Sequence, residues 1–146
     1  ALAGMRWFGV VQYIGRGRED DWCAFYTSLF GFRVLEPGER FGILPRGVIL
    51  ASPCGSFWLQ LIEPAAGEPD GDETLQRVAF GTPDVLGAVA LLRERGVGFV
   101  ETPDVHSGAR GALTRTWFDS TMFELVHLDA ADSAATQAQA PPQEQR

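Results

Sequence analysis

Few residues of this chain have the types and spacing that catalysis or metal binding requires. His106 and His127 are the only two histidines, and neither has a second histidine nearby to complete a ligand set or a proton-transfer pair. Cys23 and Cys54 fit no metal-ligand or redox spacing, so we expect two reduced thiols. No Gly-x-Ser-x-Gly run marks a nucleophile, and the run GRGR at residues 15–18 lacks the third glycine of a phosphate-binding loop. Any chemistry therefore falls on polar side chains within the predicted strands.

Composition limits the classes of partner. The 146 residues suit one domain, and 45% of them are apolar, which is enough for a full core at this length. The net charge of −7 and the pI of about 4.7 argue against nucleic acid and against an anionic membrane. No stretch approaches the ~20 apolar residues that span a bilayer, and we expect a cytoplasmic protein. An acidic surface favours cationic or neutral ligands, although local charge can differ from net charge.

Two segments lack the composition of a core. Residues 130–146 are rich in Ala, Gln, Pro and Ser and contain no aromatic or large aliphatic side chain, which predicts a disordered tail. Residues 65–73 lie in an acidic run with prolines and glycines, which predicts a linker. A single domain is therefore expected over residues 6–128, with module one at 6–64 and module two at 74–128.

Both modules show the same order of elements, one strand, one helix and three strands. In module one the helix is expected at residues 19–29 and the strands at 6–14, 32–35, 47–51 and 57–62. In module two the helix is expected at residues 85–95 and the strands at 75–80, 98–101, 112–118 and 122–128. This duplication of a βαβββ unit predicts an α+β fold and outweighs any single motif.

Five segments resemble one superfamily. They are DWCAFYTSLFGF at 21–32, LQLIEP at 59–64, LLRERGV at 91–97, FVETP at 99–103 and TWFDSTMFELV at 116–126. Together they resemble the vicinal oxygen chelate superfamily of glyoxalases, bleomycin-resistance proteins and dioxygenases. More narrowly, they are similar to the catalytic half of the 4-hydroxyphenylpyruvate dioxygenase family. The resemblance covers roughly residues 6–128. It implies two βαβββ modules whose curved mixed sheets surround a cavity, with the helices outside.

The resemblance also implies where a metal would bind. Metal-binding members take their ligands from the first and last strand of each module, and the corresponding positions here are Gly9, Gln60, Arg77 and Glu124. In the dioxygenase the ligands are two histidines and one glutamate, of which only Glu124 remains. Glycine has no side chain to donate, and arginine is a permanent cation without an acceptor. At ~4 Å and an effective dielectric of ~20, each pair of like unit charges costs about 4 kcal/mol, doubled for a divalent ion. We therefore predict no metal and no other cofactor.

In the family fold Arg77 and Glu124 lie on neighbouring strands with both side chains directed inward. The resemblance therefore implies a bidentate pair in which the guanidinium takes the place of the cation. The pair would either only neutralise a buried carboxylate, or also present spare N–H groups of Arg77 to a ligand carbonyl or carboxylate. A shifted register, with Arg77 on the outside, is the third alternative.

Strand alternation then predicts the lining of the cavity. Phe8 is expected on the opposite face, beneath a helix. The inward set is expected to combine four aromatic and four polar residues, namely Trp7, Tyr13, Trp58, Trp117, Gln60, Arg77, Arg115 and Glu124. Mostly apolar surface with a few converging polar groups is typical of a small-molecule pocket. The alternative is a hydrophobic core closed by the same side chains, although buried indole and phenol groups usually need a hydrogen-bond partner.

Two functional hypotheses follow. The first is a metal-independent binding protein for an aromatic or polycyclic small molecule, similar to the bleomycin-resistance type that sequesters an antibiotic. If the chains pair as they do in that group, a homodimer forms and the pocket can lie between subunits.

The second hypothesis is an enzyme of the same superfamily, dioxygenase-like or lyase/isomerase-like, acting on an aromatic or keto-acid substrate. Glu124 would be the general base, and Arg77 or Arg115 would stabilise an oxyanion. A carboxylate beside arginine has a lowered pKa and is a weak base, which counts against this form. A metal-dependent form would need His106, Gln60 and Glu124 to converge, which alternation does not support. Because the dioxygenase has four modules, the two modules here could also be a remnant of a larger protein.

Overall fold

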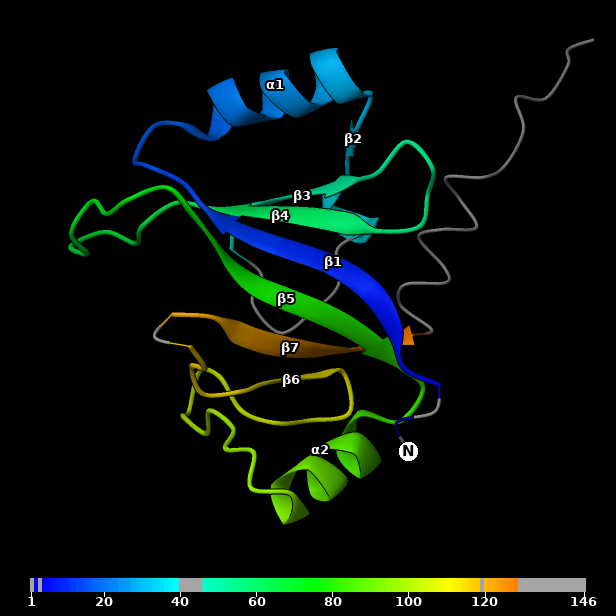
Figure 1. Ribbon diagram of the computed structural model, residues 1–146. Coiled ribbons are helices and arrows are strands. Elements are labelled where there is room, and N and C mark those ends of the chain that lie inside the picture. Colours follow the sequence, from blue (N-terminus) through cyan, green and yellow to red (C-terminus); the bar gives the residue numbers. More distant parts are fainter. Residues whose placement is uncertain (1, 3, 40–45, 119, 129–146) are drawn as a thin grey trace, which may run out of the picture.

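A computed structural model describes residues 2, 4–39, 46–118 and 120–128. The expected tail at residues 130–146 lies outside the described residues. One mixed sheet of seven strands carries two helices and a short 3-10 turn (Figure 1). In chain order the elements are β1 (Arg6–Tyr13), α1 (Glu19–Phe30), β2 (Arg33–Val34), η1 (Pro37–Glu39), β3 (Val48–Ala51), β4 (Trp58–Ile62), β5 (Thr74–Thr82), α2 (Val85–Glu94), β6 (Gly111–Leu113) and β7 (Met122–His127).

The sheet has the order β2-β3-β4-β1-β5-β7-β6. β1 and β5 run antiparallel through its centre, and each has a parallel partner on its other side, β4 beside β1 and β7 beside β5. β3 pairs antiparallel with β4, and β6 pairs antiparallel with β7. The two halves of the sheet therefore repeat one pairing pattern, with α1 over one half and α2 over the other (Figure 1). The prediction of an α+β fold with a curved mixed sheet is confirmed.

The predicted strand at residues 98–101 is not formed as a strand. Within the described residues this segment makes one isolated bridge, Phe99 with Thr114, flanked by hydrogen bonds from Val100 N to Leu113 O and from Arg115 N to Gly98 O. The chain leaves the sheet edge directly afterwards, because Thr102 and Val105 close a turn on each other. A turn so close to the bridge leaves no length for further pairing.

The two faces of the sheet carry different cores. The outer face lies beneath the helices. Trp22, Cys23 and Tyr26 of α1 pack on Val48, Leu50, Leu59 and Leu61. Val85, Ala88 and Val89 of α2 pack on Phe99, Ala112 and Leu125. The inner face carries a third cluster, formed by Phe8, Leu35, Ile49, Ala51, Trp58, Ala79, Val126 and Leu128. Neighbouring residues such as Leu50 and Ile49 divide between the faces, as strand alternation requires.

The acidic segment before β5 forms hydrogen bonds with the start of α1 and with the loop that precedes it. The carboxylate of Glu73 accepts hydrogen bonds from Trp22 Nε1, from the backbone N–H of Gly15 and from the guanidinium of Arg18. The bond from Trp22 is the largest cause that lowers the pKa of Glu73. Asp70 likewise accepts from the backbone N–H of Arg16. The segment predicted as a linker therefore has defined contacts with module one.

Neither described helix has the length and apolar character needed to cross a membrane.

Candidate functional site

A β-bulge in β1 decides which aromatic residue enters the inner face. Trp7 stands opposite Phe80 and Gly9 opposite Ala79, so Phe8 is an extra residue in the pairing of β1 with β5. Trp7 consequently lies on the outer face, 50% exposed, with its ring edge-on to Phe80 at 6.3 Å. Phe8 is buried on the inner face instead. The expected positions of Trp7 and Phe8 are therefore both wrong, because uninterrupted alternation was assumed across the bulge.

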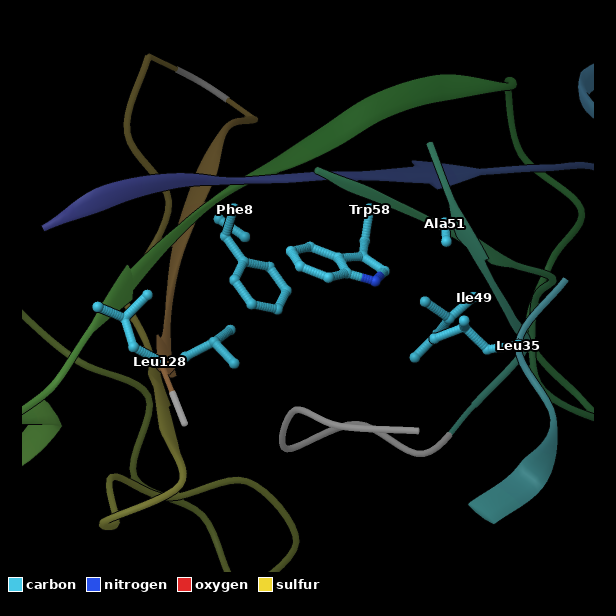
Figure 2. Packing of buried hydrophobic residues seen from close by; sticks show 8 residues of the cluster. Phe8, Leu35, Ile49, Ala51, Trp58 and Leu128 are labelled. Carbon is cyan, nitrogen blue, oxygen red and sulfur yellow. The ribbon is translucent and has the colours of Figure 1, made fainter. Parts of the chain in front are cut away.

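The inner face is filled at its centre by an aromatic pair. Phe8 and Trp58 stack with ring centroids 4.7 Å apart and an interplanar angle of 25°. Figure 2 shows the two rings side by side below the strands, with Leu128 near Phe8 and with Ile49 and Leu35 on the side of Trp58. Trp58 faces inward as predicted. This packing makes most of the inner face a hydrophobic core.

One small cavity of about 20 Å³ remains beside this pair. It brings together three of the four positions that correspond to metal ligands in relatives, Gly9, Gln60 and Glu124. Val11 and Ala79 complete the lining near them. A volume of this size accommodates about one water molecule. The cavity is therefore too small, as it stands, for an aromatic ligand.

The donors around this cavity do not fit the iron site of the dioxygenase. A Cβ atom on Gly9 would lie 1.9 Å from the carbonyl oxygen of Trp58, so the backbone has no room for any side chain there. Gln60 donates its side-chain amide to the carbonyl of Arg46. Glu124 is a buried carboxylate, 4% exposed. Within the described part of the chain, no group of three or more His, Cys, Asp or Glu side chains could hold a metal ion.

Arg77 is buried on the inner face, 4% exposed, which excludes the alternative of a shifted register. It donates through Nη2 to the hydroxyl of Tyr13 at 3.0 Å and through Nε to the side-chain oxygen of Gln76 at 3.1 Å. The predicted pair with Glu124 is not formed among the described residues. Glu124 stands opposite Ala79 in the pairing of β5 with β7, whereas the guanidinium extends the other way along the sheet, toward Tyr13.

Arg115 and Trp117 do not join the cavity. β6 ends at Leu113, and after the bridge at Thr114 the chain enters a hairpin in which Trp117 pairs with Thr121 and Phe118 has a positive φ of 47°. Trp117 lines a separate apolar hollow of about 240 Å³ on the outer face, beside α2. Arg115 is exposed, with its side chain against Gly98 at the sheet edge. The prediction that both face the cavity is wrong, because the strand stops before alternation reaches them.

A larger hollow of about 310 Å³ opens where β1 and β4 end. Tyr13 and Ile62 form its strand side, and Arg46, Glu63, Pro64, Glu68 and Asp72 are among its other lining residues. Arg46 donates to the carbonyl of Glu63 and lies 3.6 Å from the carboxylate of Glu68. Sequence reasoning placed Tyr13 on the inner face but missed Arg46 and the acidic residues, because they lie in loops that carry no periodic signal.

Cys54 is the most reactive thiol of the described chain by its surroundings. It lies exposed in the turn between β3 and β4, where its Sγ is 3.4 Å from the Oγ of Ser52 and 2.9 Å from the Oγ of Ser56. The hydrogen bond with Ser52, followed by that with Ser56, lowers the pKa of Cys54 to about 7. Cys23 differs, because partial burial raises the pKa of its thiol.

Iodoacetamide is therefore expected to modify Cys54 faster than Cys23 at neutral pH. The thiolate is the nucleophile, so the rate at Cys54 should fall as the pH drops below about 7 and reach a plateau above it. Peptide mass spectrometry over a pH series measures both rates. Ser52→Ala should raise the pH at which the modification rate of Cys54 is half-maximal and should leave that pH unchanged for Cys23. Equal half-maximal pH values for the two cysteines in the protein without the substitution would contradict the lowered pKa of Cys54.

The fold and the inner-face arrangement together define a vicinal oxygen chelate domain. Residues 11–137 match the Glyoxalase/Bleomycin resistance protein/Dioxygenase superfamily, and the chain belongs to that superfamily. Among solved structures, methylmalonyl-CoA epimerase from Mycobacterium tuberculosis shares the fold with a TM-score of 0.61 and 18% identity, over 83% of this chain and 86% of that chain. A mutant of 4-hydroxymandelate synthase from Streptomyces coelicolor also has a TM-score of 0.61 with 18% identity, over 84% of this chain and 48% of that chain.

Curated relatives are similar over part of their length. The chain is 34% identical over 110 residues to 4-hydroxyphenylpyruvate dioxygenase of Legionella pneumophila (strain Corby), which covers 66% of this chain and 31% of that protein. It is 30% identical over 110 residues to Hemolysin VllY of Vibrio vulnificus, which covers 66% of this chain and 30% of that protein. The matched segment therefore spans less than a third of these relatives.

Proposed function

We propose that this domain is a metal-independent small-molecule-binding member of its superfamily, which holds an aromatic or polycyclic ligand in the manner of the sequestration type. The observation that carries the proposal is the replacement of donors at the ligand positions. Arg77 contributes a buried cation and Gly9 has no room for a side chain, so Glu124 and Gln60 are left as the oxygen donors. Two oxygen-bearing side chains are too few ligands for a divalent ion.

The ligand is proposed to bind in the 310 Å³ hollow beside Tyr13 rather than in the 20 Å³ cavity. The hollow reaches the lower end of the volumes that small-molecule sites usually have, about 300–1,000 Å³. Tyr13 and Ile62 provide apolar surface, and Arg46 with Glu63 provides polar groups. The ligand-binding set that we propose is therefore Tyr13, Ile62, Arg46 and Glu63. Arg77, Trp58, Gln60 and Glu124 lie behind it on the inner face.

Metal content separates this proposal from the enzyme alternative. Protein purified without chelator is expected to carry iron, zinc and manganese far below one equivalent by elemental mass spectrometry. Close to one equivalent of any of them would overturn metal independence. It would instead favour a dioxygenase-like or lyase/isomerase-like enzyme acting on an aromatic or keto-acid substrate, an alternative supported by the 34% identity to 4-hydroxyphenylpyruvate dioxygenase.

Ligand binding is tested with naphthalene carrying three different head groups: 2-naphthoate, 2-naphthamide and 2-naphthylmethylammonium. At least one of them is expected to bind saturably in calorimetry. Gly71→Trp should abolish that binding by filling the hollow, because Gly71 lines it and a Cβ there meets no atom within 4 Å. Gly38→Trp is the matched control, since Gly38 has the same open surroundings but lies in η1, outside the hollow. Binding that survives Gly71→Trp would contradict this location.

Assembly and location are also proposals. We propose a homodimer in the cytoplasm, and the apolar side chains exposed on and just after α1 support a subunit contact: Phe25, Leu29, Phe30 and Val34. Native mass spectrometry measures the oligomeric state, and a monomer at micromolar concentration would contradict the dimer.

A further inference from the structure

The hollow beside α2 lies at the end of the molecule opposite α1 (Figure 1). Its floor contains Phe80 of β5 and Phe123 of β7, whose rings are parallel within 8° and 6.2 Å apart. The described residues that line it include no charged side chain, and Thr114 contributes the only hydroxyl group among them. That hydroxyl already accepts a hydrogen bond from the backbone N–H of Phe123. The hollow therefore offers apolar surface and no counter-charge to a ligand.

Three separate segments form the walls around this floor. Leu92 and Val97 come from the end of α2 and the turn after it, where the N–H of Val97 donates to the carbonyl of Leu92. Trp117 comes from the hairpin before β7, in which it exchanges two backbone hydrogen bonds with Thr121. Met5 comes from the N-terminal segment, where its N–H also donates to a backbone carbonyl. The hollow is therefore bounded by segments that each hold their own shape.

The hairpin that carries Trp117 has an unfavourable conformation. Phe118, the next residue, has a φ of 47°, in the left-handed region that bulky L-residues rarely adopt, and it is 84% exposed. Backbone strain of this kind is found most often at ligand-binding and catalytic sites. Trp117 is itself 43% exposed, so much of its ring surface is free to contact a ligand at the hollow.

The volume of the hollow, about 240 Å³, limits the size of the occupant. An apolar cavity of ~150 Å³ stays dry and binds benzene, so this hollow has room for one ring with a short side chain. A protein partner would need a contact surface of about 800 Å², which a bounded hollow of this size does not provide. A charged head group would lose its hydration inside the hollow and find no partner among the described lining residues.

We infer that the hollow beside α2 is a second ligand site, which takes an uncharged hydrocarbon-like molecule of the size of a short alkylbenzene. Among the described residues it shares no lining residue with the hollow beside Tyr13, so the inference does not depend on the binding function proposed there. The site selects its ligand by lacking polar partners, which makes ions unfavourable while apolar rings contact Phe80, Phe123 and Trp117.

Fluorine NMR of protein labelled with 5-fluorotryptophan tests this site, with the Trp117 resonance assigned through Trp117→Phe. The probes are propylbenzene, 3-phenylpropanoate and 2-phenylethylammonium, which share a body and differ in charge. Propylbenzene is expected to shift the Trp117 resonance saturably and to bind about tenfold or more tightly than either ion. Along the series toluene, ethylbenzene and propylbenzene, each added methylene should tighten binding about fourfold.

Val97→Phe should weaken the binding of propylbenzene about tenfold or more, because the larger side chain fills part of the hollow. Val34→Phe is the matched control, since Val34 lies on β2, outside the hollow, and is 40% exposed. Leu92→Ala keeps the test decisive should Val97→Phe not fold. It enlarges the hollow and should tighten hexylbenzene relative to propylbenzene by about fourfold.

The results that would overturn the inference are distinct from those that concern the hollow beside Tyr13. Ions that bind as tightly as propylbenzene, or binding of propylbenzene that survives Val97→Phe, would overturn it. A Trp117 resonance that responds to none of the probes would also overturn it, and a change of that resonance on dilution would then show that a second copy of the chain covers the hollow. Gly71→Trp fills the other hollow, so it should leave the affinity for propylbenzene unchanged.

Discussion

Gly9→Ala is expected to lower the free energy of unfolding by about 3 kcal/mol, although it adds a single methyl group. A Cβ on Gly9 would lie 1.9 Å from the carbonyl oxygen of Trp58 and 2.8 Å from its carbonyl carbon. These atoms belong to the backbone of β4, so no side-chain rotation can relieve the contact. β1 and β4 would have to separate at Gly9, which pairs with Trp58 in the parallel ladder at the centre of the sheet. Thermal unfolding should show a decrease of about 10 °C in Tm.

Gly17→Ala is the matched control for this variant. Gly17 has a positive φ of 75°, but a Cβ there meets no atom within 4 Å. Gly17→Ala should therefore lower the free energy of unfolding by about 1 kcal/mol, because only the left-handed backbone conformation disfavours alanine there. A similar loss for the two variants would show that the contact between Gly9 and Trp58 is not decisive. The same contact means that restoring a histidine at residue 9 cannot rebuild a metal site on this backbone.

Phe8→Ala is expected to cost about 3–5 kcal/mol of stability, the range for removing a large aromatic side chain from a core. Phe8 is 4% exposed and stacks on Trp58 in the middle of the inner face. Its removal would take away a ring that stacks on Trp58 and would enlarge the 20 Å³ cavity that Phe8 helps to line. Chemical denaturation followed by circular dichroism measures the loss.

Trp7→Ala provides the comparison, because Trp7 is the neighbouring aromatic residue and is larger than Phe8. It is half exposed on the outer face, so its removal should cost about 1 kcal/mol or less. A larger loss for Trp7→Ala than for Phe8→Ala would mean that the bulge in β1 is misplaced and that Trp7 is the residue that enters the core.

Several expectations from the sequence agree with the fold for simple reasons. The apolar spacing of α2 and the alternation along β4 and β7 arise from side chains that face a core on one side only. They correctly assign Trp58 and Glu124 to the inner face and Leu59 and Leu125 to the outer face. Regular elements without interruptions can be predicted from their own residues.

The wrong expectations for Trp7, Phe8, Arg115 and Trp117 depend on interruptions of strands. One extra residue in β1 moves Trp7 to the outer face and Phe8 to the inner face. The early end of β6 separates Arg115 and Trp117 from the cavity. The isolated glycine within the apolar run at residues 7–11 is the one signal that could have indicated the bulge, since a glycine inside a strand often marks one.

The sequence by itself determined the α+β class and the residue types at the four positions where relatives bind a metal. Only the tertiary structure decided that Arg77 turns toward Tyr13 instead of pairing with Glu124, and that Gly9 lies against the backbone of Trp58. The physical reason is that periodicity is a local property of one strand. Register, bulges and the direction of a long side chain depend on contacts with strands that are distant in the sequence.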